Sequence, residues 1–218
     1  MLGINRSIKS TATAILAGQK FDSRNIRKAA SSPPSSYSYT DVRAAAITHL
    51  YLAETGLAEG DSALTDRSLG EAKHQAINAI RLSPNDGFLW MSLSWIDILD
   101  QGLSTNLNAF LASSYRTAPN EGWIALRRLP MALGAYSNLS DINRRSAIRD
   151  FDGLVEAMLT REVGQILENA PAQLRAELLA SLASAEVKAK FLLGKELRRR
   201  GLHITVPGIE PEEDRPWN

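Results

Sequence analysis

Two aspartates near the middle of the chain have a spacing that permits acid–base chemistry. Asp97 and Asp100 stand three positions apart in the stretch GFLWMSLSWIDILD. On a helix, residues at i and i+3 are neighbours on one face. Two carboxylates held that close can divide into a general acid and a general base. The same spacing is common on solvated helix surfaces, so the pair does not by itself establish catalysis.

The remaining titratable residues do not form a recognisable catalytic or metal pattern. Among His49, His74 and His203, one has a possible second ligand nearby, Glu71 three positions before His74. A zinc site needs three or four ligands. The absence of cysteine excludes thiolate ligands, cysteine nucleophiles and disulfides. Gly194-Lys195 lacks the upstream glycine of a phosphate loop. We predict no catalytic residue, no metal and no cofactor.

Aromatic residues are the next candidates for a binding role. They are Phe88, Trp90, Trp95 and Trp123. Exposed rings can stack on a sugar or anchor a partner, whereas rings between helices form core. Trp95 is five positions from Trp90 and falls on a different helix face. We therefore expect Trp90 in the core, and Trp95 is the better candidate of the two for an exposed ring.

Arginines form three clusters, at 127–128, at 144, 145 and 149, and at 198–200. A guanidinium can hold a phosphate or an acidic partner. The last cluster ends a predicted helix, where cations favour the helix dipole. The predicted partner-binding residues are Trp95, Trp123, Arg127, Arg128, Arg144 and Arg145.

Composition narrows the class of protein. The chain has 218 residues, of which 44% are hydrophobic and 22% charged, and its net charge is +1. These values are typical of a globular protein and do not favour nucleic-acid binding. No apolar run approaches the roughly 18 residues that a membrane span requires. We expect that the protein neither binds nucleic acid nor spans a membrane directly.

The positions of Ser, Pro and Gly divide the chain into segments. Two short helices are predicted in an N-terminal helical arm, 1–31, followed by a Ser/Pro-rich linker, 32–39. Helical periodicity then continues through a predicted helical-repeat domain, 40–201, and the flexible tail is 202–218. Within the domain, Ser68-Leu-Gly-Glu71 has the pattern of a capping box and predicts a helix beginning at residue 68.

One short sequence motif occurs twice. RLSPNDGFLW at 81–90 and RTAPNEGWIA at 116–125 both place Pro-Asn, an acid, Gly and an aromatic residue three positions after Arg. Pro84 and Pro119 are 35 positions apart. This is close to the 34-residue period of the tetratricopeptide repeat.

The residues around Pro84 resemble that family more closely. Small residues at Ala72, Ala76 and Ala79 precede Pro84, and Trp90 and Leu93 follow it at the family's spacing. Pro119 closes the next unit. The resemblance implies an all-α fold of antiparallel helix pairs, stacked as a short α-solenoid. It implies that these residues pack between the helices of the repeats. Ser94, Ser114 and Ala125 depart from the pattern, and a generic helical bundle stays the alternative.

A second resemblance covers about residues 80–135. The run from Pro84 through Trp90 to the APNEGW segment and Arg127-Arg128 is similar to small proteobacterial proteins associated with surface-polysaccharide assembly. Those proteins lie on the periplasmic side of the inner membrane. The resemblance implies a periplasmic or inner-membrane-associated location, with the cytoplasm as the alternative. It implies a protein partner in a membrane polysaccharide-assembly system.

Two functions follow as hypotheses. The first is a non-enzymatic protein–protein interaction scaffold, accessory to bacterial surface or exopolysaccharide biosynthesis or export. The alternative is a small helical carbohydrate-binding domain or enzyme, with Trp95, Trp123 and the Asp97/Asp100 pair lining an aromatic cleft. The scarcity of catalytic groups and the repeated sequence motif favour the scaffold hypothesis.

Overall fold

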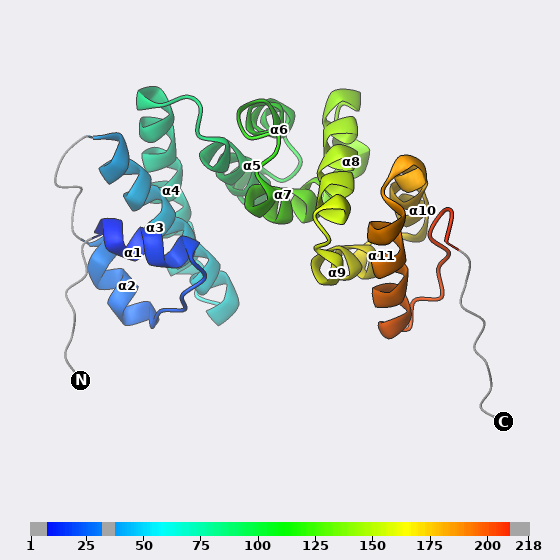
Figure 1. The fold of residues 1–218 in the computed structure, drawn as a ribbon. Coiled ribbons are helices and arrows are strands. Elements are labelled where there is room, and N and C mark those ends of the chain that lie inside the picture. Colours follow the sequence, from blue (N-terminus) through cyan, green and yellow to red (C-terminus); the bar gives the residue numbers. More distant parts are fainter. Residues whose placement is uncertain (1–7, 32–37, 210–218) are drawn as a thin grey trace. The chain divides into compact units, whose positions relative to one another are not determined.

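The computed structural model describes residues 8–31 and 38–209, and all regular structure in those ranges is helical (Figure 1). The all-α prediction is therefore confirmed. The helices are α1 Ile8–Leu16, α2 Ser23–Ala30, α3 Tyr39–Glu59, α4 Ser62–Leu82, α5 Gly87–Gln101, α6 Thr105–Thr117, α7 Gly122–Gly134, α8 Asp141–Glu156, α9 Thr160–Asn169, α10 Ala172–Ser181 and α11 Val187–Arg199. Short 3₁₀ turns follow α7 and α10 at Tyr136–Asn138 and Leu182–Ser184.

The chain forms two compact units, a first unit of residues 1–117 and a second of residues 118–218. The division falls between α6 and α7, inside the range 40–201 that we expected to be one domain. Periodicity within helices does not reveal such a boundary, because the boundary depends on which helices bury apolar surface together.

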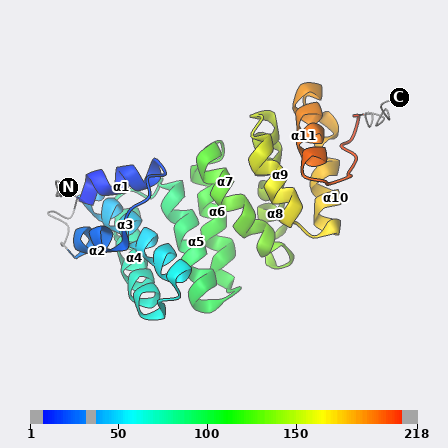
Figure 2. The same cartoon turned by 90° about the horizontal axis from the view of Figure 1, so that it is seen from below.

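The N-terminal helices belong to the core of the first unit. Both α1 and α2 pack on α3 (Figure 2), and Ala12, Ile15 and Ile26 are buried. The Phe21 backbone N–H donates to the Tyr51 hydroxyl at 2.9 Å, and the two rings meet edge to face. Residues 8–31 are thus not a separate arm. Most of the predicted linker, 32–37, lies outside the described residues; beyond it Ser38 caps α3 and Tyr39 is its first residue.

Helices α3 and α4 form the most extensive helical hairpin of the first unit. The turn consists of Gly60, in the left-handed conformation, and Asp61, whose carboxylate accepts the Leu64 backbone N–H at 2.9 Å. Helix α4 therefore begins two turns before the predicted capping box, and Ser68 is buried inside it. The capping-box prediction was wrong because Asp61 is the N-cap of this helix.

Small residues line the buried side of α4. Ala72, Ala76 and Ala79 are fully buried, at positions where a larger side chain would push the neighbouring helices apart. Leu93 on α5 is also buried, whereas Pro84 and Pro119 are exposed just beyond the ends of α4 and α6.

The two segments that share the repeated motif, 81–90 and 116–125, differ in their hydrogen bonding. Asp86 caps α5 by accepting the backbone N–H groups of Phe88 and Leu89, both at 3.1 Å. Its other oxygen accepts the Tyr39 hydroxyl at 2.8 Å and Arg43 Nε at 2.7 Å, which ties α5 to α3. The corresponding acid of the second segment, Glu121, makes no side-chain cap bond on α7. The repeated sequence motif therefore does not produce the same capping contacts in the two segments.

Trp90 is half-buried and does not lie in the core as we expected. Its indole Nε1 donates to the Pro84 carbonyl at 2.8 Å, and its ring lies against Phe110 of α6 with centroids 6.1 Å apart. The core between α5 and α6 is formed mainly by leucines, with Leu89, Leu107 and Leu111 fully buried. Ser114, fully buried, donates to the Gly87 carbonyl at 2.8 Å.

In the second unit α7 packs on α8 and α9 packs on α11. Leu129, Phe151, Val163 and Leu193 are fully buried at these contacts. Part of the predicted flexible tail joins this core: Val206 is 2% exposed, and the side chains of Val206 and Ile209 lie over Gly194 of α11. An apolar contact thus orders residues 202–209; residues 210–218 are outside the described range.

Candidate functional site

A cavity of about 330 Å³ lies among α2, α3 and α4 of the first unit. Each helix contributes residues at helical spacing, so one face of each turns toward the space. Its walls are Arg27, Ala30 and Ser31 from the α2 end, His49 and Leu52 from α3, and Leu64, Arg67, Ser68 and Glu71 from α4. Ala30, Leu52 and Leu64 make part of the wall apolar, and the rest is polar.

His49 is the most enclosed titratable group of the cavity. Burial lowers the pKa of its imidazole, and the charge of the Glu71 carboxylate acts in the opposite direction. The imidazole is therefore held neutral to lower pH than a free histidine. Across residues 8–31 and 38–209 it makes no hydrogen bond.

The α4 wall of the cavity carries three further polar groups that form no hydrogen bond or ion pair in the described chain. Ser68 is 3% exposed, yet its hydroxyl forms no hydrogen bond with any described residue. Arg67 and Glu71, four positions apart on the same face, form no ion pair with each other or elsewhere in the described ranges. Buried polar groups ordinarily find partners, so the Ser68 hydroxyl is open to a ligand, with the exposed Arg67 and Glu71 beside it on the same helix face.

Arg27 marks the rim of the cavity and is already engaged. Its Nη2 lies 3.3 Å from Asp61 Oδ2 and 4.0 Å from Glu59 Oε2. The Leu64 backbone N–H, together with Arg27, lowers the pKa of Asp61. Arg27 therefore joins α2 to the α3–α4 turn, whereas Arg67, the other arginine of the described lining, forms no hydrogen bond or ion pair.

The two aspartates proposed for acid–base chemistry do separate structural work. Asp97 is buried and accepts the hydroxyl of Ser104, which fixes the turn between α5 and α6. Asp100 is exposed and pairs with Lys73 of α4 at 3.1 Å, and this contact lowers its pKa. Trp95, on the same helix, is half-buried. No acid–base pair arises from this spacing, because the two carboxylates bind different partners.

Arg128 is a correction to the predicted partner surface. Its side chain is 0% exposed, with Nε at 2.8 Å and Nη2 at 2.7 Å from the two carboxylate oxygens of Asp150. The same Nη2 donates to the Ala118 carbonyl at 3.2 Å. Arg128 thus fastens α7 to α8 and cannot meet a partner. Its neighbour Arg127 is exposed.

The other predicted contacts divide in the same way. Arg144 folds back on its own segment, donating to the carbonyls of Tyr136 at 3.1 Å and Ser137 at 3.0 Å. Arg145 is exposed on α8. Trp123 is 41% exposed and stands one turn before Arg127 on the same face of α7. A surface of Trp123 and Arg127 is therefore what remains of the predicted site on α7.

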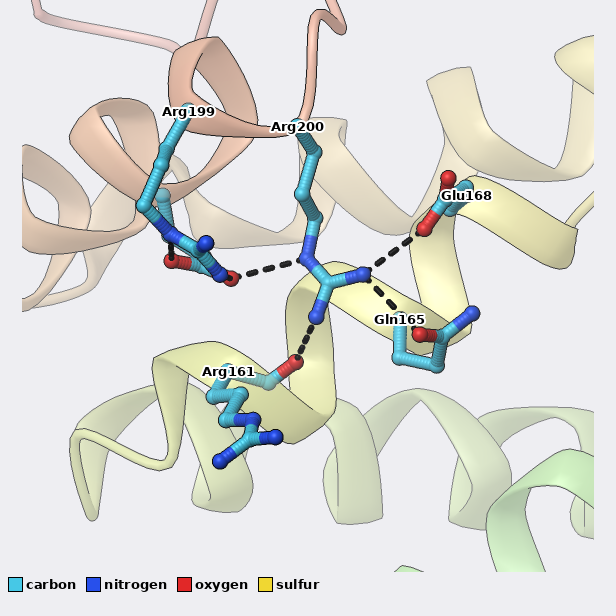
Figure 3. A network of polar contacts seen from close by, with 6 residues as sticks. Arg161, Gln165, Glu168, Arg199 and Arg200 are labelled. Carbon is cyan, nitrogen blue, oxygen red and sulfur yellow. Dashed lines mark hydrogen bonds and ion pairs between the residues drawn. The ribbon is translucent and has the colours of Figure 1, made fainter.

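The third arginine cluster closes the core of the second unit. Arg200 reaches across α9 and bonds to the Arg161 carbonyl, Gln165 and Glu168 at 3.0, 2.9 and 2.7 Å (Figure 3). Gly164 leaves room for it, since a Cβ there would lie 2.8 Å from Arg200 Nε. Glu196 accepts from both Arg199 and Arg200. Arg200 thus holds the end of α11 against α9, while Arg199 pairs within α11.

The Glu196 contacts predict a pH dependence of stability. Hydrogen bonds from Arg199 and then Arg200 lower the pKa of Glu196 to about 2. A carboxyl with a depressed folded pKa stabilises the fold above its unfolded value, near 4.5, and this contribution is lost as the pH falls toward 2. We expect Glu196→Gln to cost about 1 kcal/mol at pH 7 after solvent screening. Denaturant unfolding at pH 7 and pH 3 measures it.

The exposed Glu162→Gln is the matched control for this measurement and should change the free energy of unfolding little at either pH. An equal loss for Glu196→Gln at both pH values would contradict the assignment.

Comparison with protein-family models, curated proteins and solved structures finds no match to this chain. The tetratricopeptide-like and polysaccharide-related resemblances therefore stay predictions. No described helix is long and apolar enough to cross a membrane. Within the described ranges no three His, Asp or Glu side chains gather as metal ligands.

Sequence reasoning missed the cavity. Ser68 and Glu71 were interpreted as a capping box, and His49 as an isolated histidine. A usable signal was present: Leu64, Arg67, Ser68 and Glu71 recur at helical spacing, so three polar residues share a face with a leucine. The contribution of α2 carries no such signal.

Proposed function

We propose that this chain is a non-enzymatic interaction module that holds another protein. Its helical hairpins are of the α-solenoid type, in which close helix packing makes a stiff support for a binding face. The buried alanines of α4 and the closely packed α3–α4 turn support this, as does the use of polar residues for fastening helices.

The observation that carries the proposal is the surface of Trp123 and Arg127. Trp123 is 41% exposed, and the exposed Arg127 follows it one turn later on the same face of α7. Tryptophan and arginine are the residues most enriched among interface hot spots, where they combine large contact area with directed hydrogen bonds. We infer a partner segment with an apolar pocket beside a carboxylate.

The sequence resemblance supports a process for this module. It favours a protein partner in the assembly or export of surface polysaccharide, on the periplasmic side of the inner membrane. Loss of surface polysaccharide in a strain that lacks this chain, restored by the wild type and not by Arg127→Glu, is the expected result.

A cross-linking experiment tests the binding face. With the photo-reactive residue p-benzoylphenylalanine at position 123, illumination of the host cells is expected to give one discrete adduct with a partner protein. The same residue at Gln173, exposed on α10, is the matched site and should give none. Arg127→Glu should reduce the adduct at least tenfold, whereas Lys188→Glu, with the same charge change on α11, should leave it intact. No adduct, or equal adducts at both sites, would contradict the proposal.

A further inference from the structure

The cavity among α2, α3 and α4 is a second candidate for binding, independent of the Trp123 and Arg127 surface. It is bounded by elements of the first unit alone. About 330 Å³ is at the lower end of the range for ligand pockets, which suits a small molecule rather than a protein segment.

The polar groups of the lining define the chemistry of an occupant. Arg67 presents N–H donors and a positive charge, Glu71 an acceptor and a negative charge, and neither forms a hydrogen bond or ion pair in the described chain. Side chains at i and i+4 of a helix stand about 5–6 Å apart at their Cβ atoms. A ligand that carries both an anion and a cation satisfies this pair, whereas an ion of one sign leaves the other charge unpaired.

The remaining walls complete the fit. The Ser68 hydroxyl and the His49 imidazole offer one further donor and one donor or acceptor, both largely enclosed. Ala30, Leu52 and Leu64 provide an apolar surface for a hydrocarbon side chain. Arg27 is held by Asp61 and Glu59, so the lining cation left for the ligand is Arg67.

We propose that this cavity binds a small zwitterionic amino acid with an apolar side chain of about leucine size. Its carboxylate bonds to Arg67 and Ser68, its ammonium to Glu71, and its side chain packs on Leu52 and Leu64.

Titration of the full chain with L-leucine, followed by the ring C–H signals of the histidines in NMR spectra, tests the proposal. The His49 signal is expected to shift in a saturable manner. His74 and His203 are outside the cavity lining and serve as internal references. 4-Methylpentanoate, which lacks the ammonium group, and 3-methylbutylamine, which lacks the carboxylate, should each bind at least tenfold more weakly. An unmoved His49 signal, or equal binding of either analogue, would overturn the proposal.

Variants separate the two charges. Arg67→Gln and Glu71→Gln should each weaken leucine binding at least tenfold, while Arg81→Gln, exposed on the same helix, should leave it unchanged. Arg67 and Glu71 are exposed, so thermal unfolding should show the wild-type midpoint for both variants. Equal weakening by Arg81→Gln would refute the assignment, and the analogue titrations decide the matter even if a variant fails to fold.

Discussion

Replacement of Arg128 by methionine is expected to lower the free energy of unfolding by about 3–5 kcal/mol. The side chain is completely buried, and it is the bidentate partner of Asp150. Methionine preserves much of the volume and removes the charge, which leaves the Asp150 carboxylate unpaired in the interior. Denaturant unfolding, monitored by a probe in the second unit, measures the loss.

The double variant distinguishes an unpaired charge from poor packing. Arg128→Met with Asp150→Leu removes both charges, and we expect it to recover most of the loss, because apolar residues often replace a buried ion pair without cost. Arg127→Met, one position away and exposed, should change the free energy of unfolding by less than about 1 kcal/mol. A double variant no more stable than Arg128→Met alone would show that packing dominates.

The same variant should respond to pH in a defined direction. Burial already raises the pKa of Asp150, and Arg128 opposes that shift. Without Arg128 the folded pKa rises further. A carboxyl with a raised folded pKa favours folding below its unfolded value, near 3.8, and this contribution is lost as the pH rises through the folded pKa. The penalty of Arg128→Met should therefore be smaller at pH 4 than at pH 7.

Gly56→Ala is expected to lower the free energy of unfolding by about 3 kcal/mol, a cost typical of overpacking. A Cβ at this position would lie 2.6 Å from Thr65 Oγ1 and 3.0 Å from the Thr65 backbone nitrogen. The backbone contact cannot be relieved by a rotamer change, so α3 and α4 must separate at their turn. Thermal or denaturant unfolding gives the value.

A glycine of the same hairpin is the matched control. Gly70 lies inside α4, and a Cβ added there would have no neighbouring atom within 4 Å. Alanine there should stabilise the protein by up to about 1 kcal/mol through helix propensity alone. Thr65→Ala in the Gly56→Ala background should recover part of the loss by removing Oγ1. Equal effects of Gly56→Ala and Gly70→Ala would exclude the close approach as the cause.

The helices could be predicted because their signals are local. Asp22 caps α2 through its own side chain, and Pro84 and Pro119 follow the ends of α4 and α6. The start of α4 was misplaced because Asp61 and Ser68 are both acceptable caps, and the contact with α3 decides between them.

The candidate sites were less predictable, since each depends on residues far apart in the chain. Arg127 and Arg128 are adjacent and identical in type, yet one is exposed and the other fully buried. What separates them is Asp150, 22 positions away from Arg128, which only the packing of α7 on α8 brings into contact.

The sequence by itself determined an all-helical chain and the approximate limits of its helices, because backbone hydrogen bonds, caps and prolines act within a few residues. The tertiary structure alone decided which polar residues form hydrogen bonds and ion pairs between helices and which face a cavity. Arg67, Ser68 and Glu71 share a helix face that helical periodicity alone can reveal. Their meeting with His49 arises because burial of the α3–α4 hairpin brings two distant faces together, and no local pattern records that event.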